Sequence, residues 1–149
     1  MIKFVIFIVL LLLGGGLYYL HAAREQLAVA TLTIKNKEIQ IEIADSLAAQ
    51  ALGLSGRQSL CADCGMLFIY DRPKFQRFTM RDMNFPLDMI FIDKGKIVEI
   101  REAIPNPKSG ESSVIIQSAN QADAVLEVND GFVWKNKIKV GDMVVLRKK

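Results

Sequence analysis

The fold of this chain is decided around residues 78–93, which read FTMRDMNFPLDMIFID. The first of these residues are typical of the end of a strand, and residues 81–85 predict a polar turn that Pro86 helps to terminate. Residues 87–92 then predict a strand that is apolar on both faces, apart from the carboxylate of Asp88. Such a strand is buried on both faces, so the sequence places it at the centre of the domain.

Alternating apolar residues and turn motifs predict further short strands on both sides of this segment. Residues 30–34 and 37–43 are expected to form a hairpin, and residues 71–74 and 93–96 are expected to form turns. The other strands are expected at residues 65–70, 75–80, 97–104, 124–128 and 143–147. Eight or nine short strands indicate a mainly β domain, built as a small β-barrel or β-sandwich.

One short helix and one long loop interrupt the strands. Ser46 or the preceding aspartate can cap a helix that runs to Leu54 and is ended by nearby glycines. Residues 105–121 are rich in Pro, Ser, Gly and Asn, which predicts either a functional cover or a loosely ordered loop, with a short strand at residues 114–116.

Residues 1–30 predict a membrane anchor or signal segment in front of a single β-rich domain at residues 31–149. Lys3 precedes an uncharged apolar run at residues 4–20, which is just long enough to span a bilayer. No small-residue cleavage site follows closely, so we favour an uncleaved transmembrane helix over a cleaved signal peptide. Either segment places the domain on the extracytoplasmic, periplasmic side, tethered to the membrane or secreted if cleaved.

The charge pattern and the histidine content exclude several classes of function. The chain has 19 Lys and Arg against 16 Asp and Glu, and the charges are interspersed, which does not predict a nucleic-acid partner. The single histidine, His21, lies in the N-terminal segment, so the domain has no imidazole for a Ser-His or Cys-His nucleophile or for a metal site. We therefore expect no metal and no cofactor, and enzymatic activity is uncertain but disfavoured.

Six short motifs follow one another through the domain. They are GLSGR at residues 53–57, GMLF at 65–68, F-x-M at 78–80, PLDMIFID at 86–93, LEVN-x-G at 126–131 and VGD at 140–142. As a set they resemble domain-of-unknown-function family 192 (DUF192), an uncharacterised family of bacteria and archaea. The resemblance covers about residues 31–147. It implies a small, mostly β, barrel-like fold with one helix, often behind a signal peptide or an anchor, and no established activity.

The chain departs from the usual pattern of that family at two places. Thr79 stands where a tryptophan is common, and Asp82 and Met83 stand where Asn-Thr is common. The resemblance therefore implies that the lining of any pocket shared by the family is altered here.

Two carboxylates are expected to be buried, and their partners decide between a binding site and a structural network. Asp88 lies in the central strand, and Glu127 lies between two apolar residues. A buried ionised carboxylate needs a cation or several hydrogen bonds. The available cations are Arg57, Arg77 and Arg81. These groups can form a pocket for an anionic ligand, or a salt-bridge network that ties the helix end to the sheet.

The sulfur-containing residues have a structural and a functional interpretation. Cys61 and Cys64 form a C-x-x-C motif, which in an exported domain indicates a local disulfide, with redox chemistry or a metal site as weaker alternatives. Four methionines nearby could bind Cu(I), although methionine more often fills irregular cores. They are Met66, Met80, Met83 and Met89.

We expect the chain to be a membrane-tethered β-domain that binds a small anionic ligand or a partner protein. The candidate binding residues are Arg57, Phe78, Met80, Arg81, Asp88 and Glu127, and no catalytic residue is assigned. The first alternative is a hydrolase or lyase that uses Asp88 or Glu127 with an arginine clamp. The second alternative is a copper or thiol-redox accessory protein that uses the Cys and Met residues.

Overall fold

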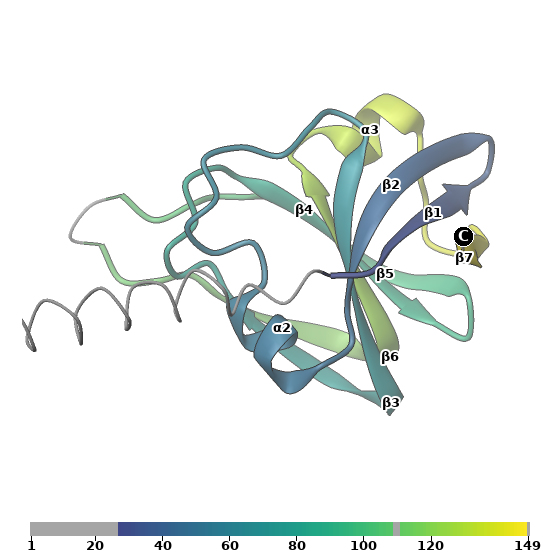
Figure 1. Ribbon diagram of the computed structural model, residues 1–149, viewed down its shortest axis with the longest axis horizontal. Helices are drawn as coiled ribbons and strands as arrows, with labels where there is room; N and C mark the ends of the chain where they lie inside the picture. The colour runs from purple at the N-terminus through teal and green to yellow at the C-terminus, as the bar shows by residue number, and fades with distance from the viewer. Residues whose placement is uncertain (1–26, 109–110, 149) are drawn as a thin grey trace, which may run out of the picture.

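The computed structural model describes residues 27–108 and 111–148, which form a mainly β domain (Figure 1). Seven strands form one sheet in the order β5-β4-β6-β3-β2-β1-β7. The strands are β1 (Val29–Ile34), β2 (Lys37–Ala44), β3 (Cys64–Thr79), β4 (Leu87–Asp93), β5 (Lys96–Ile104), β6 (Ile115–Asn129) and β7 (Val144–Lys148); the helices are α2 (Leu47–Leu52) and α3 (Phe132–Asn136). The mainly β class is confirmed, whereas the single expected helix is joined by a second, α3, in the described part of the chain.

The sheet is not a closed barrel. Its edge strands are β5 and β7, and an isolated bridge between Lys96 and Met143 connects their ends. Beside this bridge, the amide of Val144 donates to the carbonyl of Gly95 (2.8 Å). The two edges therefore touch at one corner without a continuous ladder. Of the expected small β-barrel or β-sandwich, the mainly β class holds, and the domain is a single seven-stranded sheet that does not close into a barrel.

β3 and β6 are much longer than expected, because they pair with each other over most of their length. β3 has 16 residues and runs through residues 71–74, where the sequence predicts a turn. The pairing register shifts between Ile69 and Lys74, so an irregularity absorbs the turn-forming residues without ending the strand. β6 has 15 residues and begins at Ile115, so the loop expected at residues 105–121 is wrong over its second part.

The crossover between the parallel strands β2 and β3 carries α2. The hydroxyl of Ser46 accepts a hydrogen bond from the amide of Ala49 (3.2 Å), as expected for a helix cap. The Nε2 of Gln50 donates to the carbonyl of Ile69 in β3 (2.7 Å). Figure 1 shows that α2 lies beside β3 and β6.

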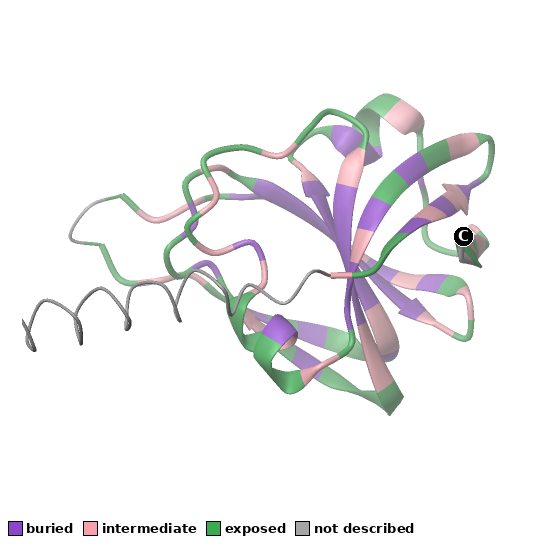
Figure 2. Cartoon of the chain, in the orientation of Figure 1, coloured by how far each residue is buried: buried purple, intermediate pink, exposed green. Residues whose placement is uncertain are grey.

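Buried side chains form one cluster on each face of β4. Leu87, Met89 and Phe91 belong to one cluster, and the two isoleucines of this strand belong to the other. Every residue of β4 except the last is buried (Figure 2). The prediction of a doubly buried strand is confirmed, but β4 is the second strand from one edge, and β3 occupies the middle of the sheet.

The anchor expected at residues 4–20 lies outside the residues that the structure describes. Among the described residues, no helix has the length and apolar composition needed to span a bilayer.

Candidate functional site

Asp88 is a fully buried carboxylate, and both of its oxygens accept backbone hydrogen bonds. Oδ1 accepts from the amide of Ala103 in β5 (2.9 Å), and Oδ2 accepts from the amide of Val133 in the first turn of α3 (3.0 Å). Ala103 has a positive φ of 54°, a conformation that non-glycine residues rarely adopt. Asp88 therefore fastens β5 and α3 to β4, and its partners are amides rather than an arginine.

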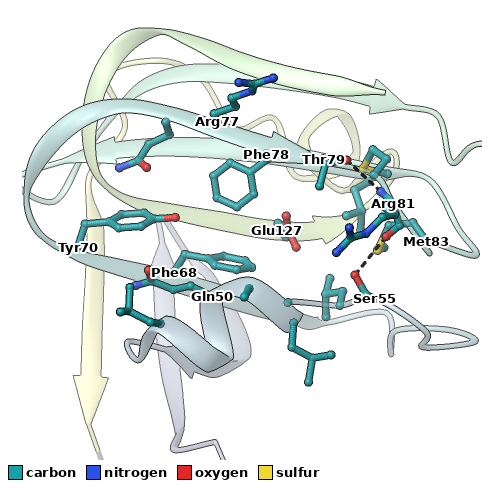
Figure 3. A pocket seen from close by; sticks show the side chains of 18 of the residues that line it. Gln50, Ser55, Phe68, Tyr70, Arg77, Phe78, Thr79, Arg81, Met83 and Glu127 are labelled. Atoms are coloured by element: carbon teal, nitrogen blue, oxygen red, sulfur yellow. Dashed lines mark hydrogen bonds between the residues drawn. The ribbon is translucent and has the colours of Figure 1, made fainter. Parts of the chain in front are cut away.

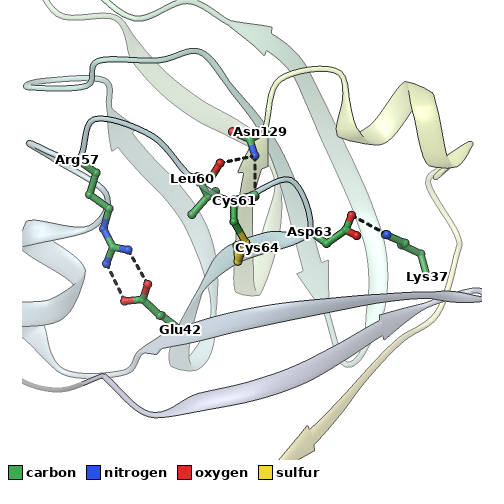
Figure 4. The surroundings of a disulfide bond; sticks show 8 residues. All are labelled: Lys37, Glu42, Arg57, Leu60, Cys61, Asp63, Cys64 and Asn129. Atoms are coloured by element: carbon green, nitrogen blue, oxygen red, sulfur yellow. Dashed lines mark hydrogen bonds and ion pairs between the residues drawn. A yellow bond between two sulfur atoms is a disulfide. The ribbon is translucent and has the colours of Figure 1, made fainter.

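Arg57 is paired with Glu42 of β2 (Figure 4). Nη1 donates to Oε1 (2.5 Å) and Nη2 to Oε2 (2.7 Å), and this hydrogen-bonded pairing raises the pKa of Arg57. The carbonyl of Arg57 accepts from Nδ2 of Asn84 (2.8 Å), which joins the segment after α2 to the turn before β4. Arg57 thus has the structural role that the sequence left as an alternative, with Glu42 as its acid.

Glu127 of β6 is also buried, with only 5% of its surface exposed, but its environment is different. Its cross-strand neighbours are Met66 in β3 and Met89 in β4, which are both apolar. Within the described residues, no group donates a hydrogen bond to its carboxyl and no cation pairs with it. Burial alone raises the pKa of Glu127 to about 8, so the carboxyl is mostly protonated at neutral pH.

Glu127 lines a cavity of about 490 Å³ between β3, β6 and α2 (Figure 3). The apolar part of the lining comprises Phe68, Phe78, Met80, Met83 and Leu87, together with residues of α2. The basic side chains of the lining are Lys74, Arg77 and Arg81. The cavity therefore combines apolar walls, a basic rim and one buried carboxyl.

Hydrogen bonds between the segment that follows α2 and the turn after β3 hold the walls of this cavity together. The hydroxyl of Ser55 donates to the carbonyl of Arg81 (3.1 Å), and the amide of Gly56 donates to the carbonyl of Asp82 (2.8 Å). On the opposite side, a Cβ added to Gly65 would lie 2.8 Å from the carbonyl oxygen of Glu127. Glycine is therefore required there for β3 to approach the strand that carries Glu127.

Tyr70 and Lys74 form one end of the cavity. Figure 3 shows the Tyr70 hydroxyl pointing toward Glu127. Burial, and to a lesser extent the charge of Glu127, raise the pKa of Tyr70 to about 12. The Nζ of Lys74 lies 4.5 Å from the centroid of the Tyr70 ring, which is a cation–π contact.

The structure brings four of the predicted binding residues to one cavity and leaves two outside its lining. Phe78, Met80, Arg81 and Glu127 line the cavity, whereas Arg57 and Asp88 do not. Tyr70 and Lys74 were missed. The alternation of Met66, Phe68 and Tyr70 in the strand predicted at residues 65–70 already places Tyr70 on the face of Phe68, whereas the turn predicted at residues 71–74 hid Lys74.

Two of the three departures from the family pattern lie in the lining of the same cavity. Thr79 and Met83 belong to its lining. The Oγ1 of Thr79 lies 2.6 Å from the Oγ of Ser113, and it accepts from the amide of Arg81 (3.3 Å). Asp82 has a positive φ of 58° and supplies the turn that follows. The altered lining that the resemblance implies thus concerns the region around Arg81.

Cys61 and Cys64, the first residue of β3, form a disulfide, as predicted (Figure 4). The Nδ2 of Asn129 donates to the carbonyls of Leu60 (3.2 Å) and Cys61 (2.9 Å), and this fixes the disulfide loop against the end of β6. Because a strand follows the pair, no helix N-terminus is present to stabilise a thiolate. The geometry is that of a structural crosslink.

The four methionines considered as copper ligands all belong to the core. Met66, Met80, Met83 and Met89 are buried in one apolar cluster. Within the described residues, no group of three or more His, Cys, Asp or Glu side chains could hold a metal ion.

The chain matches the family model DUF192, described as Uncharacterized ACR, over residues 30–146. Among solved structures, it is similar to a protein of Sinorhizobium meliloti 1021 that is proposed to be a transcription regulator. The TM-score is 0.75 with 27% identity, and the match covers 83% of this chain and 98% of that one. It is also similar to a protein of unknown function from Novosphingobium aromaticivorans DSM 12444, with a TM-score of 0.73, 29% identity and coverage of 83% and 89%. No curated protein matches the chain significantly. By its sequence motifs, its family match and its fold, the chain belongs to the DUF192 family.

Proposed function

We propose that this domain is a non-enzymatic module that binds a small molecule in the cavity between β3, β6 and α2. The observation that carries the proposal is Glu127, a buried carboxyl that lines the cavity and receives no hydrogen bond from the described part of the chain. The carboxyl lies in the wall of the cavity, so a ligand there can supply the partner that the described protein groups do not provide.

The size and the lining of the cavity also support a small-molecule site. Its volume of about 490 Å³ falls within the range of roughly 300–1,000 Å³ that is usual for such sites. Apolar and aromatic walls with a few polar groups are typical of them. Three lining residues, Leu47, Leu52 and Phe75, are exposed and extend the apolar surface to the rim.

We assign Arg81 to an anionic group of the ligand. Its side chain is 73% exposed, and the hydrogen bond from Ser55 to its carbonyl fixes its backbone at the edge of the cavity. Figure 3 places it at the end opposite Tyr70. Arg57 and Asp88 support the site indirectly, because their hydrogen bonds hold the elements that carry the lining.

The function is testable with a thermal-shift screen of the full chain against small molecules. Ala51 is an exposed lining residue of α2, and Ala51→Trp fills the cavity mouth without touching the core. Ala48 is exposed on the same helix but outside the lining, so Ala48→Trp is the matched control. A true ligand raises the Tm of the wild type and of Ala48→Trp but not of Ala51→Trp. Equal shifts in all three proteins would place binding elsewhere and refute the proposal.

We further propose that residues 4–20 tether the domain to the membrane on its extracytoplasmic side. The apolar run in the sequence supports a tether, and the Cys61–Cys64 disulfide supports an oxidising compartment. The full chain should sediment with membranes after alkaline extraction, and a variant without residues 4–20 should stay in the supernatant. Extraction of the full chain into the supernatant would contradict the tether.

A further inference from the structure

We infer that the ligand is a small zwitterion whose ammonium group lies between Glu127 and the aromatic rings of the cavity, while its anionic group meets Arg81. This inference rests on the proposed function and adds the chemical class of the ligand.

Glu127 has no positively charged partner beside its carboxyl among the residues that line the cavity. Among the lining residues, Glu127 is the only acid, and the basic side chains Lys74, Arg77 and Arg81 are all exposed or at the rim. The protein therefore supplies no cation at the buried carboxyl itself. An ammonium group on the ligand supplies the positive charge that an ionised, buried Glu127 needs.

Three aromatic rings line the cavity near Glu127. Phe68 and Phe78 meet edge to face, with centroids 5.1 Å apart and planes at 89°, so their rings form a corner of the cavity wall. Figure 3 shows Phe68, Phe78 and Tyr70 around Glu127. The faces of aromatic rings attract cations and repel anions, and several rings around one acid are an arrangement suited to an alkylammonium group.

The chain itself places an ammonium group, that of Lys74, over the ring of Tyr70. The Nζ of Lys74 lies 4.5 Å from the centroid of Tyr70, at the same end of the cavity. This contact shows that the lining accepts an alkylammonium group in cation–π geometry. Lys74 is exposed, so a ligand can displace it at little cost.

The acidic and basic side chains are distributed unevenly along the cavity. Glu127, whose carboxyl becomes negative when it loses its proton, is buried, and the positive groups lie at the rim, with Arg81 opposite the Tyr70 end. Once Glu127 is ionised, a ligand with one charge meets repulsion from one of the two regions. A zwitterion that enters with its ammonium first complements both regions.

The test uses three probes that differ only in charge. γ-Butyrobetaine carries both groups, its tert-butyl carbon isostere keeps the carboxylate without the cation, and n-butyltrimethylammonium keeps the cation without the carboxylate. Calorimetric titration of the full chain is expected to rank γ-butyrobetaine first, with at least a tenfold weaker Kd for each single-charge probe.

Two matched substitutions assign each charge to a residue. Glu127→Gln is expected to weaken γ-butyrobetaine at least tenfold at pH 8 and to leave the carbon isostere unchanged. Arg81→Gln is expected to weaken both carboxylate probes and to leave n-butyltrimethylammonium unchanged. Lys74→Met keeps the apolar stem and removes the competing cation, so it is expected to strengthen both ammonium probes severalfold.

The pH dependence gives an independent readout. Because the pKa of Glu127 is about 8, binding of an ammonium requires the carboxyl to lose its proton below that pH. The affinity for γ-butyrobetaine should therefore rise by up to about tenfold per pH unit from pH 6 toward 8, and then level off. Tyr70 has a pKa of about 12 and stays neutral in this range, and the other charged lining groups, Lys74, Arg77 and Arg81, are cations.

Three results would overturn the inference. If the carbon isostere binds as tightly as γ-butyrobetaine, the ligand is a simple anion; the proposed function then stands and the inference falls. Affinity that decreases from pH 6 to 8 would show that protonated Glu127 donates to a neutral or anionic group instead. If no probe binds while the screen yields ligands without an ammonium group, the zwitterion is likewise refuted and the binding function is kept.

Discussion

Asp88 and Glu127 lie on neighbouring strands, one residue apart in register, yet they are buried in opposite ways. Asp88 faces Val128 across β4 and β6, and Glu127 faces Met89. Asp88 receives two backbone amides, whereas Glu127 receives no donor in the described part of the chain and faces a cavity. Burial of a carboxylate therefore does not by itself identify a site. A site is indicated only where the surrounding protein leaves the carboxylate unsatisfied.

The same isosteric change at both positions should have opposite effects on the stability of the domain. Asp88→Asn should destabilise the domain by about 4 kcal/mol, because the new amide group faces an N–H donor and removes a charge that two amides stabilise. Urea unfolding of the variant at several pH values measures the loss. A loss below about 1 kcal/mol would show that these two hydrogen bonds do not hold β5 and α3.

Glu127→Gln should have the opposite effect and depend on pH. The folded pKa of about 8 lies above the ordinary value of 4.5, so the folded state holds its proton more tightly than the unfolded state. In the wild type this stabilising contribution is complete below pH 4.5, decreases as pH rises, and is gone above pH 8. The wild type should therefore lose on the order of 3 kcal/mol between pH 5 and 8 relative to Glu127→Gln.

The control for that experiment is the same pair of unfolding curves at low pH. Below about pH 5, Gln and protonated Glu are nearly equivalent, so the two proteins should have similar stability there. A constant difference between them at all pH values would contradict a raised pKa at Glu127.

Reduction of the disulfide tests a feature on the structural side of the comparison. Cys61 and Cys64 close a very short loop, so reduction should cost about 2 kcal/mol by the loop-entropy relation. Ligand affinity should not change, because neither cysteine belongs to the cavity lining. Unfolding and calorimetric titration of the double variant Cys61→Ser, Cys64→Ser measure both quantities, and a selective loss of affinity would give the disulfide a role in binding.

The smallest effect is expected for Arg57→Ala. Its pair with Glu42 is partly exposed, with 28% and 33% of the side-chain surfaces accessible, so solvent screening reduces its value to about 0.5–1 kcal/mol. Thermal unfolding in low and high salt measures this contribution, which should shrink as salt rises. A large loss of ligand affinity in Arg57→Ala without loss of stability would show that Arg57 takes part in ligand binding.

The sequence predicts the β class, the buried strand around Asp88, the cap at Ser46 and the disulfide, because each depends on local pattern or spacing. It does not predict the length of β3, since the turn-forming residues 71–73 lie in an irregularity between Ile69 and Lys74, which both pair with β6. The continued strand brings Tyr70 and Lys74 to the cavity that Glu127 lines. Local propensity contains no information on such long-range contacts.

The sequence also does not predict which groups pair with the charged residues, for a related reason. Asp88 and Arg57 could be recognised as groups that need partners. The amides that satisfy Asp88 come from β5 and α3, and the acid that satisfies Arg57 comes from β2. Only the sheet order determines which of these groups meet, and therefore which carboxyl remains free for a ligand.

The most direct test of the account is a carboxyl carbon NMR titration of Glu127 in the full chain labelled with ¹³C-glutamate. The resonance of Glu127 is identified by its absence from Glu127→Gln. We expect the titration of the Glu127 carboxyl to have its midpoint near pH 8 in the free protein and at a lower pH when γ-butyrobetaine is bound. A midpoint near the ordinary value of 4.5 in the free protein would show that Glu127 already has a partner or contact with solvent, and would contradict the central claim.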